Sequence, residues 1–302
     1  MSVPIMPSDD EVRALVPGPR SITWRRSGDA RVFTAAGYAL VMQVAHPTVG
    51  AGVAEHSTYA TDPWGRLLRT LDFTNSLIYG GPEQAAAVGR NIRAMHKQIK
   101  GVKPDGTRYH ALEPAAYAWV HATLLEAIVS AHARFGHPMS PRERDRFFTE
   151  WRGLGRLLGV RDRDIPETWA EFSEYFDATV ADVLEDNPTV HGVLAALHRP
   201  ARPPVPLLGE AAWKAARLPA ARAVRLATVG LLPPVLRERF GLRWSRAQEL
   251  ELRAIGAVSR SVTPLMPRSL RVMGPSYMRW RREETDRLAA APPTLPALTA
   301  TA

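Results

Sequence analysis

Histidines supply the candidate metal chemistry of this sequence. Five of the nine fall between residues 46 and 121, namely His46, His56, His96, His110 and His121. The chain has no cysteine, which excludes structural disulfides, zinc ribbons, thiolate-ligated iron–sulfur clusters and a cysteine nucleophile. Any metal must therefore be held by histidine, aspartate or glutamate, or arrive inside a cofactor.

His96 is the best-placed candidate ligand. The spacing predicts a helix from Pro82 to Gly101 whose apolar stripe includes Ile92 and Ile99. His96 follows Ile92 by four residues and precedes Ile99 by three, so its ring points to the interior from the edge of this stripe. A neutral imidazole placed there can ligate iron through one nitrogen while the other donates to a backbone carbonyl. A hydrogen-bonded core histidine is the alternative, and spacing alone does not decide between them.

A second candidate group lies on a helix expected to begin at Asp62. Arg66, Arg69 and Thr70 stand at positions i, i+3 and i+4, which places two guanidiniums and a hydroxyl on one face. If buried, the arginines need an anion, such as a cofactor carboxylate, a substrate or the protein's own Asp62 and Asp72. A partly solvated pair bridged to these two aspartates is the alternative.

The remaining candidates receive weaker assignments. Glu55 is the most plausible carboxylate base near an iron, and its neighbour His56, like His46, is either a pocket residue or plain structure. His121 lies in the middle of an apolar stripe, where a buried, hydrogen-bonded histidine is the default. A non-haem iron on two of these histidines or His96, together with Glu55, also stays open, although no two of them show the close spacing that such sites often use.

The chain reads as helical nearly throughout, because apolar residues recur at spacings of three and four. The expected helices cover residues 29–46, 62–81, 82–101, 113–136, 140–158, a stretch from 166 and another from 245, with a turn at 103–106. We therefore expect an all-α, single globular multi-helix domain at residues 21–288, with a flexible segment at 1–20 and a disordered tail at 289–302. Four prolines between Arg199 and Pro206 mark a candidate hinge.

Positive charge is concentrated toward the C-terminus. Residues 199–287 hold 18 Arg and Lys against 7 Asp and Glu. This asymmetry favours contact with an anionic partner such as a membrane surface, for which the helical stretch 211–232, interrupted at Pro219, is suited. A solvated arginine-rich surface is the alternative. Nucleic acid is not an expected partner, because the segment has no reader motif and few aromatic residues among its basic ones.

One stretch is long enough to test as a membrane span. Residues 32–54 contain no Asp, Lys, Arg or Glu, but His46-Pro47 breaks the stretch and Gly50 and Gly52 loosen its second half. We interpret it as a buried helix followed by a turn. The first twenty residues lack the apolar core of a secretory signal. We therefore expect a cytoplasmic protein that touches a membrane at most peripherally.

Short motifs in a fixed order carry a family resemblance. They are Gly28-Asp29-Ala30-Arg31, Ala45-His46-Pro47, Val49-Gly50-Ala51-Gly52-Val53, Glu55-His56-Ser57, Arg66 to Thr70, Arg93-Ala94-Met95-His96, Ile99-Lys100-Gly101 and Trp119-Val120-His121-Ala122. Over residues 21–260 the chain resembles the MpaB and latex-clearing-protein (rubber oxygenase) catalytic domain family.

The resemblance implies an all-helical fold with a globin-like core that holds haem b. His96 looks like the counterpart of the histidine that ligates iron on the proximal side in rubber-cleaving members. Their distal Arg-x-x-Lys-Thr motif is matched at Arg66 and Thr70, but Arg69 replaces the lysine. Because a guanidinium has no free lone pair for a metal, a lysine-capped iron is not available. We expect a five-coordinate or water-bound iron, with Arg66 and Arg69 pairing with haem propionates or hydrogen-bonding dioxygen.

These observations favour a haem-dependent oxygenase. Its expected partners are dioxygen and an apolar small-molecule or polymer substrate, a class that includes unsaturated and isoprenoid-like molecules. Polyisoprene itself is not carried over from the resemblance, since Arg69 departs from the pattern of the rubber-cleaving members. The alternative is a non-catalytic protein that binds a lipid-like ligand and docks on anionic membrane through its basic C-terminal third.

Overall fold

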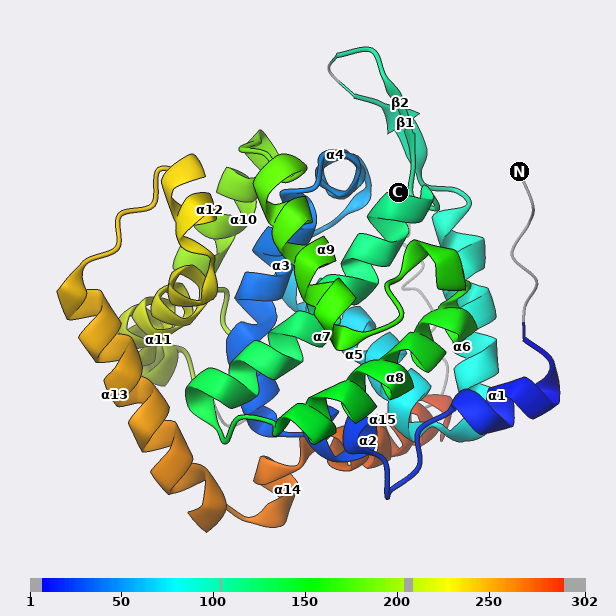
Figure 1. The fold of residues 1–302 in the computed structure, drawn as a ribbon. Coiled ribbons are helices and arrows are strands. Elements are labelled where there is room, and N and C mark those ends of the chain that lie inside the picture. Colours follow the sequence, from blue (N-terminus) through cyan, green and yellow to red (C-terminus); the bar gives the residue numbers. More distant parts are fainter. Residues whose placement is uncertain (1–6, 104, 204–208, 291–302) are drawn as a thin grey trace, which may run out of the picture.

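The computed structural model describes residues 7–103, 105–203 and 209–290, with the side chains of 285–290 left out. It confirms the all-α class: the described chain folds as one globular helical domain with a single short hairpin (Figure 1). The first half contains α1 (Asp9–Leu15), α2 (Ile22–Ser27), η1 (Ala30–Ala35), α3 (Ala36–Val44), α4 (Pro47–His56), α5 (Pro63–Tyr79), α6 (Gly81–His96), β1 (Lys100–Val102), β2 (Arg108–His110) and α7 (Pro114–Phe135). The second half contains α8 (Pro141–Leu158), η2 (Asp162–Asp164), α9 (Trp169–Asp182), α10 (Pro188–His198), α11 (Glu210–Leu231), α12 (Pro234–Arg239), α13 (Arg246–Val262), η3 (Thr263–Leu265), α14 (Arg268–Arg271) and α15 (Met273–Ala290).

Helix α7 forms the centre of the core. It packs against η1, α3, α8 and α13, and α9 crosses nearby (Figure 1). Its Trp119 is fully buried, and the indole Nε1 donates to the carbonyl oxygen of Met42 on α3 at 2.9 Å. That bond satisfies the polar atom of a large apolar side chain, so α7 and α3 meet without a buried polar group left over.

Helices α5 and α6 follow each other in the chain and pack against each other, and they carry two of the candidate residues. Asp62 caps α5 by accepting from the backbone of Gly65, and the chain turns at Gly81, which adopts φ of 80°. Arg66 lies 14 residues before Gly80, and His96 lies 16 residues after it. Each residue therefore lies about four helical turns from this turn, and the two are at the ends of α5 and α6 that the turn does not join, the open end of the pair.

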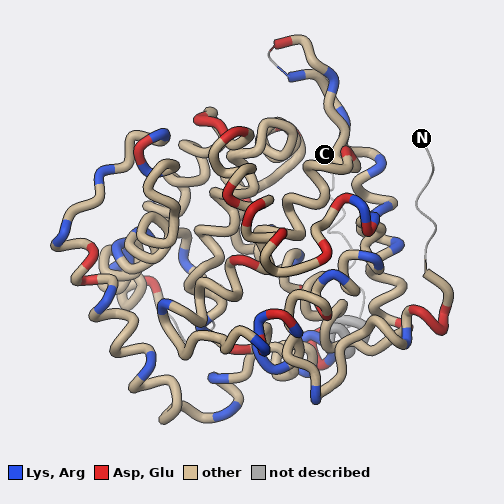
Figure 2. Tube along the Cα trace, viewed as in Figure 1, with Lys and Arg blue, Asp and Glu red and all other residues tan. Residues whose placement is uncertain are grey.

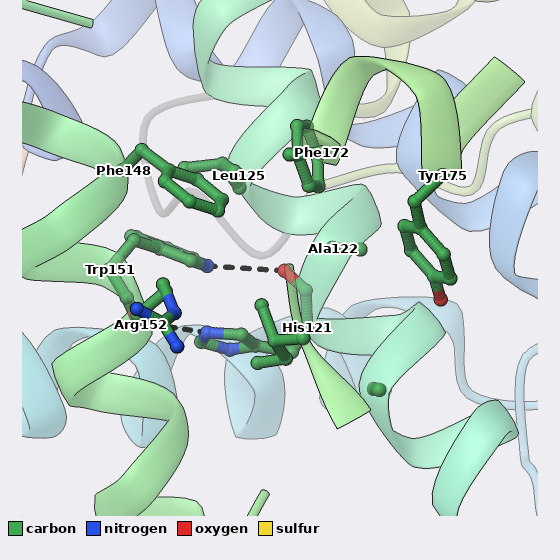
Figure 3. Close-up of a pocket in the computed structure, with 10 residues that line it drawn as sticks. His121, Ala122, Leu125, Phe148, Trp151, Arg152, Phe172 and Tyr175 are labelled. Atoms are coloured by element: carbon green, nitrogen blue, oxygen red, sulfur yellow. Dashed lines mark hydrogen bonds between the residues drawn. The ribbon is translucent and has the colours of Figure 1, made fainter. Parts of the chain in front are cut away.

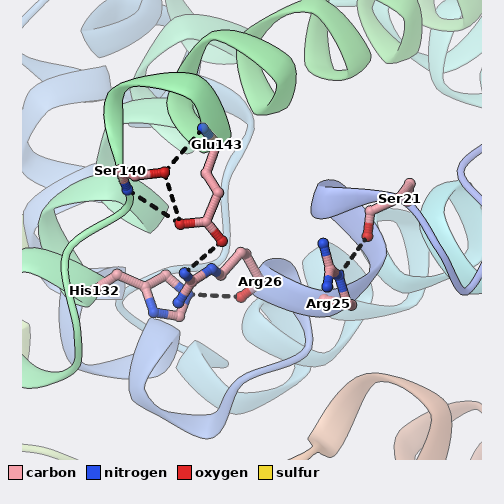
Figure 4. Close-up of polar contacts among 6 residues, drawn as sticks. All are labelled: Ser21, Arg25, Arg26, His132, Ser140 and Glu143. Atoms are coloured by element: carbon pink, nitrogen blue, oxygen red, sulfur yellow. Dashed lines mark hydrogen bonds and ion pairs between the residues drawn. The ribbon is translucent and has the colours of Figure 1, made fainter.

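A polar network attaches α2 to α7 and α8 (Figure 4). Ser140 and Glu143 form a capping box at the start of α8, and Glu143 also pairs with Arg26 on α2 at 2.9 Å. His132 on α7 donates from Nε2 to the carbonyl oxygen of Arg26 at 2.9 Å. Arg26 therefore joins α2 to two consecutive helices, α7 and α8, that are distant from it in sequence.

The C-terminal helix closes over the first half of the chain. Helix α15 packs on α5, where Asp72 accepts hydrogen bonds from Tyr277 and, through both oxygens, from Arg281. The backbone of Met273 donates to the carbonyl oxygen of Gly28 at 2.7 Å. The basic C-terminal third is thus an integral part of the domain and covers the helix that carries Arg66.

Several boundaries differ from those expected. The helix predicted at 82–101 ends at His96, because the chain enters the hairpin of β1 and β2, whose register pairs Gly101 with Tyr109. The turn between the strands is as predicted at Gly106, which has φ of 84°, while Pro104 lies outside the described residues. The stretch after Pro47 is helix α4 rather than a turn, with the proline at its first position.

The ends of the chain also differ. Residues 9–15 form a helix rather than part of a flexible segment, because Ser8 and Glu11 make a capping box that the sequence analysis overlooked, and Val12 is buried. Helix α9 begins at Trp169, capped by Thr168, rather than at 166. Pro219 lies inside α11 without ending it. Of the candidate hinge, residues 204–208 are outside the described part, as are residues 291–302 of the predicted tail.

Candidate active site at the open end of the α5–α6 pair

His96 is the last residue of α6, and its ring is held in a defined orientation. Nδ1 lies 2.7 Å from the carbonyl oxygen of Ile92, and the ring makes an edge contact with Tyr117 of α7 at 5.5 Å between centroids. A carbonyl oxygen only accepts, so Nδ1 carries the proton and Nε2 keeps its lone pair. Burial lowers the pKa of His96, against the opposing bond to Ile92, and the nearby His110 lowers the pKa further. The ring is therefore a neutral imidazole whose Nε2 can act as a ligand.

Arg66 is a partly buried cation whose side-chain partner is a neutral hydroxyl group. Its Nε donates to the hydroxyl oxygen of Ser57 at 3.1 Å. In the part of the chain that the structure describes, no carboxylate comes within ion-pair distance of it. Burial lowers the pKa of the Arg66 guanidinium, and the charge of Arg69 adds to this effect. An anionic group bound beside Arg66 would relieve both.

Arg69 and Thr70 lie on α5 with Arg66, but the three side chains have different partners and exposure. Arg69 is 54% exposed and bonds to Thr58 at 2.9 Å and to Asp62 at 3.5 Å. Thr70 donates its hydroxyl to the carbonyl oxygen of Arg66 within the same helix at 3.0 Å. The interpretation as a solvated pair therefore holds for Arg69, whereas Asp72, the other expected partner, is engaged by α15.

The last residues of α4 and those that follow it connect these elements to the hairpin. Glu55, about half exposed, accepts a hydrogen bond of 2.5 Å from Tyr109 on β2. Burial, with Glu55 as a second cause, raises the pKa of Tyr109 to about 12. Two residues further along, Ser57 meets Arg66. The 55–58 segment thus contacts both β2 and α5, and Tyr109 and Ser57 are site residues that the sequence analysis missed because they lay in stretches read as loop.

His46 presents a buried polar atom at the start of α4. Its side chain is 6% exposed, and Nδ1 has no hydrogen-bond partner. Burial lowers the pKa of His46, against the opposing charge of Glu113, which itself accepts a hydrogen bond from Thr48 at 2.8 Å. A neutral imidazole with an unused nitrogen is therefore available at this end of the domain.

His121 is structural (Figure 3). Its Nε2 bonds to the carbonyl oxygen of Trp151 at 2.9 Å, the Trp151 indole donates back to the carbonyl oxygen of His121 at 3.1 Å, and the two rings stack. Burial lowers the pKa of His121 to about 4. The adjacent cavity has a volume of about 10 Å³, room for one water molecule at most. His121 is thus the buried, hydrogen-bonded histidine that the sequence favoured.

The candidate residues meet the needs of two kinds of iron site, non-haem and haem, to different degrees. No three His, Asp or Glu side chains among the described residues lie together so as to hold a metal ion, so the non-haem site left open by the sequence does not form there. A haem needs one protein ligand on its proximal side, a countercharge for its propionates and apolar walls. Of the described residues, His96 could supply the ligand and Arg66 the countercharge, and Leu67, Leu68 and Leu71, on the same helix as Arg66, are half-buried apolar side chains.

Comparison with known proteins defines the class first: the chain matches a family of oxygenase catalytic domains. The family is described as "ER-bound oxygenase mpaB/B'/Rubber oxygenase, catalytic domain", and its model matches residues 24–261. The chain belongs to this family, which confirms the resemblance seen in the sequence. No curated protein and no solved structure gives a match. Among the described helices, none is long and apolar enough to cross a membrane.

Proposed function

We propose that this chain is a haem-dependent oxygenase in which His96 ligates the iron and the substrate is apolar. Family membership supports the oxygenase class. The observation that carries the cofactor is the bond from Nδ1 of His96 to the carbonyl oxygen of Ile92, because it leaves Nε2 as the lone-pair nitrogen and fixes the ring. When bound, haem supplies the chemistry by which dioxygen is activated.

His96 and Arg66 have separate tasks in this proposal. His96 stays neutral near pH 7, because its pKa is lowered, and its bond to Ile92 prevents the ring from rotating. Arg66 offers a guanidinium to a carboxylate, such as a propionate, or to an oxygen atom of the bound reactants. The described part of the chain supplies both groups, the imidazole of His96 and the guanidinium of Arg66.

The other candidate residues act at the edge of this site. Arg69 is solvated and positions the 58–62 segment through Thr58 and Asp62, so we assign it a lesser part than Arg66. Thr70 retains an oxygen lone pair that can accept a hydrogen bond. Glu55 is the candidate base: Oε2 accepts from Tyr109, and Oε1 can accept a proton.

An apolar substrate would suit the partly buried leucines of α5. Leu67, Leu68 and Leu71 remain only partly buried although their side chains are large and apolar. An unsaturated or isoprenoid-like chain would remove this surface from water, which contributes roughly 25 cal/mol per Å² buried.

Oxygen uptake tests the proposal. Haem-loaded protein is supplied with alkenes of increasing length, from geraniol to squalene, and oxygen consumption and cleaved or oxygenated products are measured. We expect turnover of at least one alkene, its loss in His96→Ala and its retention in His137→Ala, which changes an exposed histidine. Equal turnover in wild type and His96→Ala contradicts the proposal, as does the lack of turnover with every alkene.

We propose membrane contact as a second property, carried by the edge formed by α13, η3 and α14. Residues 252–282 contain seven arginines and no acid, and Figure 2 shows basic positions along this edge beyond the start of α13, where Glu249 and Glu251 lie. Leu265 at its tip is 83% exposed, and Val258 and Leu270 are 60% and 55% exposed. Exposed apolar groups among cations suit an anionic bilayer.

Vesicle co-sedimentation tests that contact. We expect binding to phosphatidylserine-containing vesicles at low salt, less binding at high salt and loss in Arg268→Glu/Arg271→Glu. The matched control is Arg163→Glu, on η2 at another part of the surface. Equal binding by neutral vesicles, or unchanged binding by the double variant, contradicts it. Binding with no oxygenase activity would instead favour the lipid-binding alternative.

A further inference from the structure

A cleft of about 350 Å³ lies between α3, α7, α9 and the α11–α12 junction. Its volume suits a small organic molecule. Tyr117, which contacts His96, and Glu126, which lines the cleft, are nine residues apart on α7, a distance of about 13 Å along the helix axis. The cleft is therefore separate from the candidate active site.

Glu126, at the base of the cleft, is a carboxyl group that pairs with no cation among the described residues. Glu126 accepts hydrogen bonds from Tyr38 at 3.0 Å and from Ser130 at 2.8 Å, one on each oxygen. Two hydroxyl donors orient the carboxyl group, but both are neutral. In the described ranges of the chain, no Arg, Lys or His forms an ion pair with Glu126. A buried carboxylate in this state is costly unless it gains a proton or a cation.

The other charged groups leave the cleft negative. Asp177 lines it from α9 and adds its charge to that of Glu126. Arg237 lines it from α12, but its guanidinium stacks over Trp244, 5.4 Å from the ring centre, and interacts with the charge of Glu249. Burial, with Asp177 as a further cause, raises the pKa of Glu126 to about 7.

The walls of the cleft are aromatic and apolar. Trp169, Phe172 and Phe176 line one side from α9, and Leu231 and Leu232 line the other. Aromatic faces attract organic cations as well as apolar groups, because each ring carries a negative face.

We infer that this cleft binds a small organic ammonium ion, with the ammonium group at Glu126 and the apolar body against the aromatic wall. The ammonium group supplies the countercharge that the described residues do not, and Asp177 adds attraction at the cleft. The ligand class is a primary amine on an aromatic or short aliphatic body.

Calorimetric titration with benzylamine tests the inference, with benzyl alcohol as the neutral analogue of similar shape. We expect benzylamine to bind wild type and benzyl alcohol to bind at least about tenfold more weakly, because the alcohol cannot pair with the carboxylate. Glu126→Gln, which keeps the shape and removes the charge, should lose a similar factor. The control is Glu174→Gln, which neutralises an exposed acid on α9 and should bind as wild type does.

Two further measurements keep the inference testable if Glu126→Gln does not fold. Asp177→Asn, at an exposed position, should weaken benzylamine binding by a smaller factor. Benzylamine binding near pH 7 should also release protons, because the ammonium group stabilises the ionised form of Glu126. The inference is overturned if wild type binds no benzylamine at millimolar concentration, if the alcohol binds equally well, or if both charge-removing variants bind as wild type does.

Discussion

Arg66 donates from Nε to the hydroxyl oxygen of Ser57 at 3.1 Å, while its neighbour Arg69, one turn later, is solvated and pairs with Asp62. Two arginines that look equivalent in sequence thus have different surroundings. The partly buried one, Arg66, has only a neutral hydroxyl as its side-chain partner within the described residues, and so has charge to offer a ligand.

This difference predicts unequal effects on haem retention. Arg66→Met should lower the affinity of the protein for haem by about tenfold, since a charge-assisted hydrogen bond contributes roughly 1.5–3 kcal/mol. Arg69→Met should change it by less than about threefold, because exposed ion pairs contribute little. Haem transfer to apomyoglobin measures both. Equal losses in the two variants would show that the two arginines do not differ as described.

The close packing of Gly101, on the hairpin, against Glu55 and Tyr109 leads to a second prediction. A Cβ added at Gly101 would collide with Oε2 of Glu55 and lie 2.8 Å from the hydroxyl oxygen of Tyr109. Gly101→Ala should therefore destabilise the protein by roughly 1–3 kcal/mol. Gly52→Ala is the matched control, because its Cβ meets Ile99 and Tyr109 at 3.6 Å, an ordinary contact. Urea unfolding measures both, and a neutral Gly101→Ala would mean that Glu55 does not pack against the hairpin as it does here.

His121 predicts a pH dependence of stability. Its pKa falls from 6.5 to about 4 on folding, so the unfolded chain binds more protons between these values. Stability contributed by the neutral ring is complete above pH 6.5 and is lost as the pH falls toward 4, by about 3 kcal/mol in all. Glu126, whose pKa rises to about 7, acts in the opposite direction, since its stabilising effect grows as the pH falls from 7 to 4.5.

The variant His121→Gln isolates that contribution. The free energy of unfolding of wild type and variant is measured by urea titration from pH 7 to pH 4. The wild type should lose more stability over this range than the variant does. Parallel curves would mean that His121 is not buried in its neutral form.

The network in Figure 4 predicts that Glu143 stabilises more than a helix cap alone does. Glu143→Ala removes both the capping bond at Ser140 and the ion pair with Arg26, at a cost of about 1–2 kcal/mol. Glu171→Ala removes a capping box at Thr168. Glu171 forms no ion pair with another described residue, so it serves as the comparison. Its cost should be smaller, about 0.5–1 kcal/mol. Thermal unfolding compares the two, and a larger loss in Glu171→Ala would contradict the role of Arg26.

The sequence predicted the helices better than the site. Boundaries with strong local signals, such as Asp62-Pro63 and Ser140 with Glu143, were found because caps act within a few residues. The hairpin was missed because its strands are only three residues long, too short to give a periodic signal. Local spacing also could not separate Arg66 from Arg69, since their surroundings depend on the segment after α4. Side-chain partners such as Tyr109 depend on contacts between distant segments and have no local signature.

The most direct test of the account is the absorption spectrum of the protein purified after expression with sufficient haem, combined with a pyridine-haemochrome assay. Wild type, His96→Ala and the control His137→Ala are compared. We expect near-stoichiometric haem b with a Soret band in wild type and His137→Ala. In His96→Ala we expect loss or a marked shift of the band. A folded wild-type protein without haem, or an unchanged spectrum in His96→Ala, would contradict the assignment of His96 as the iron ligand.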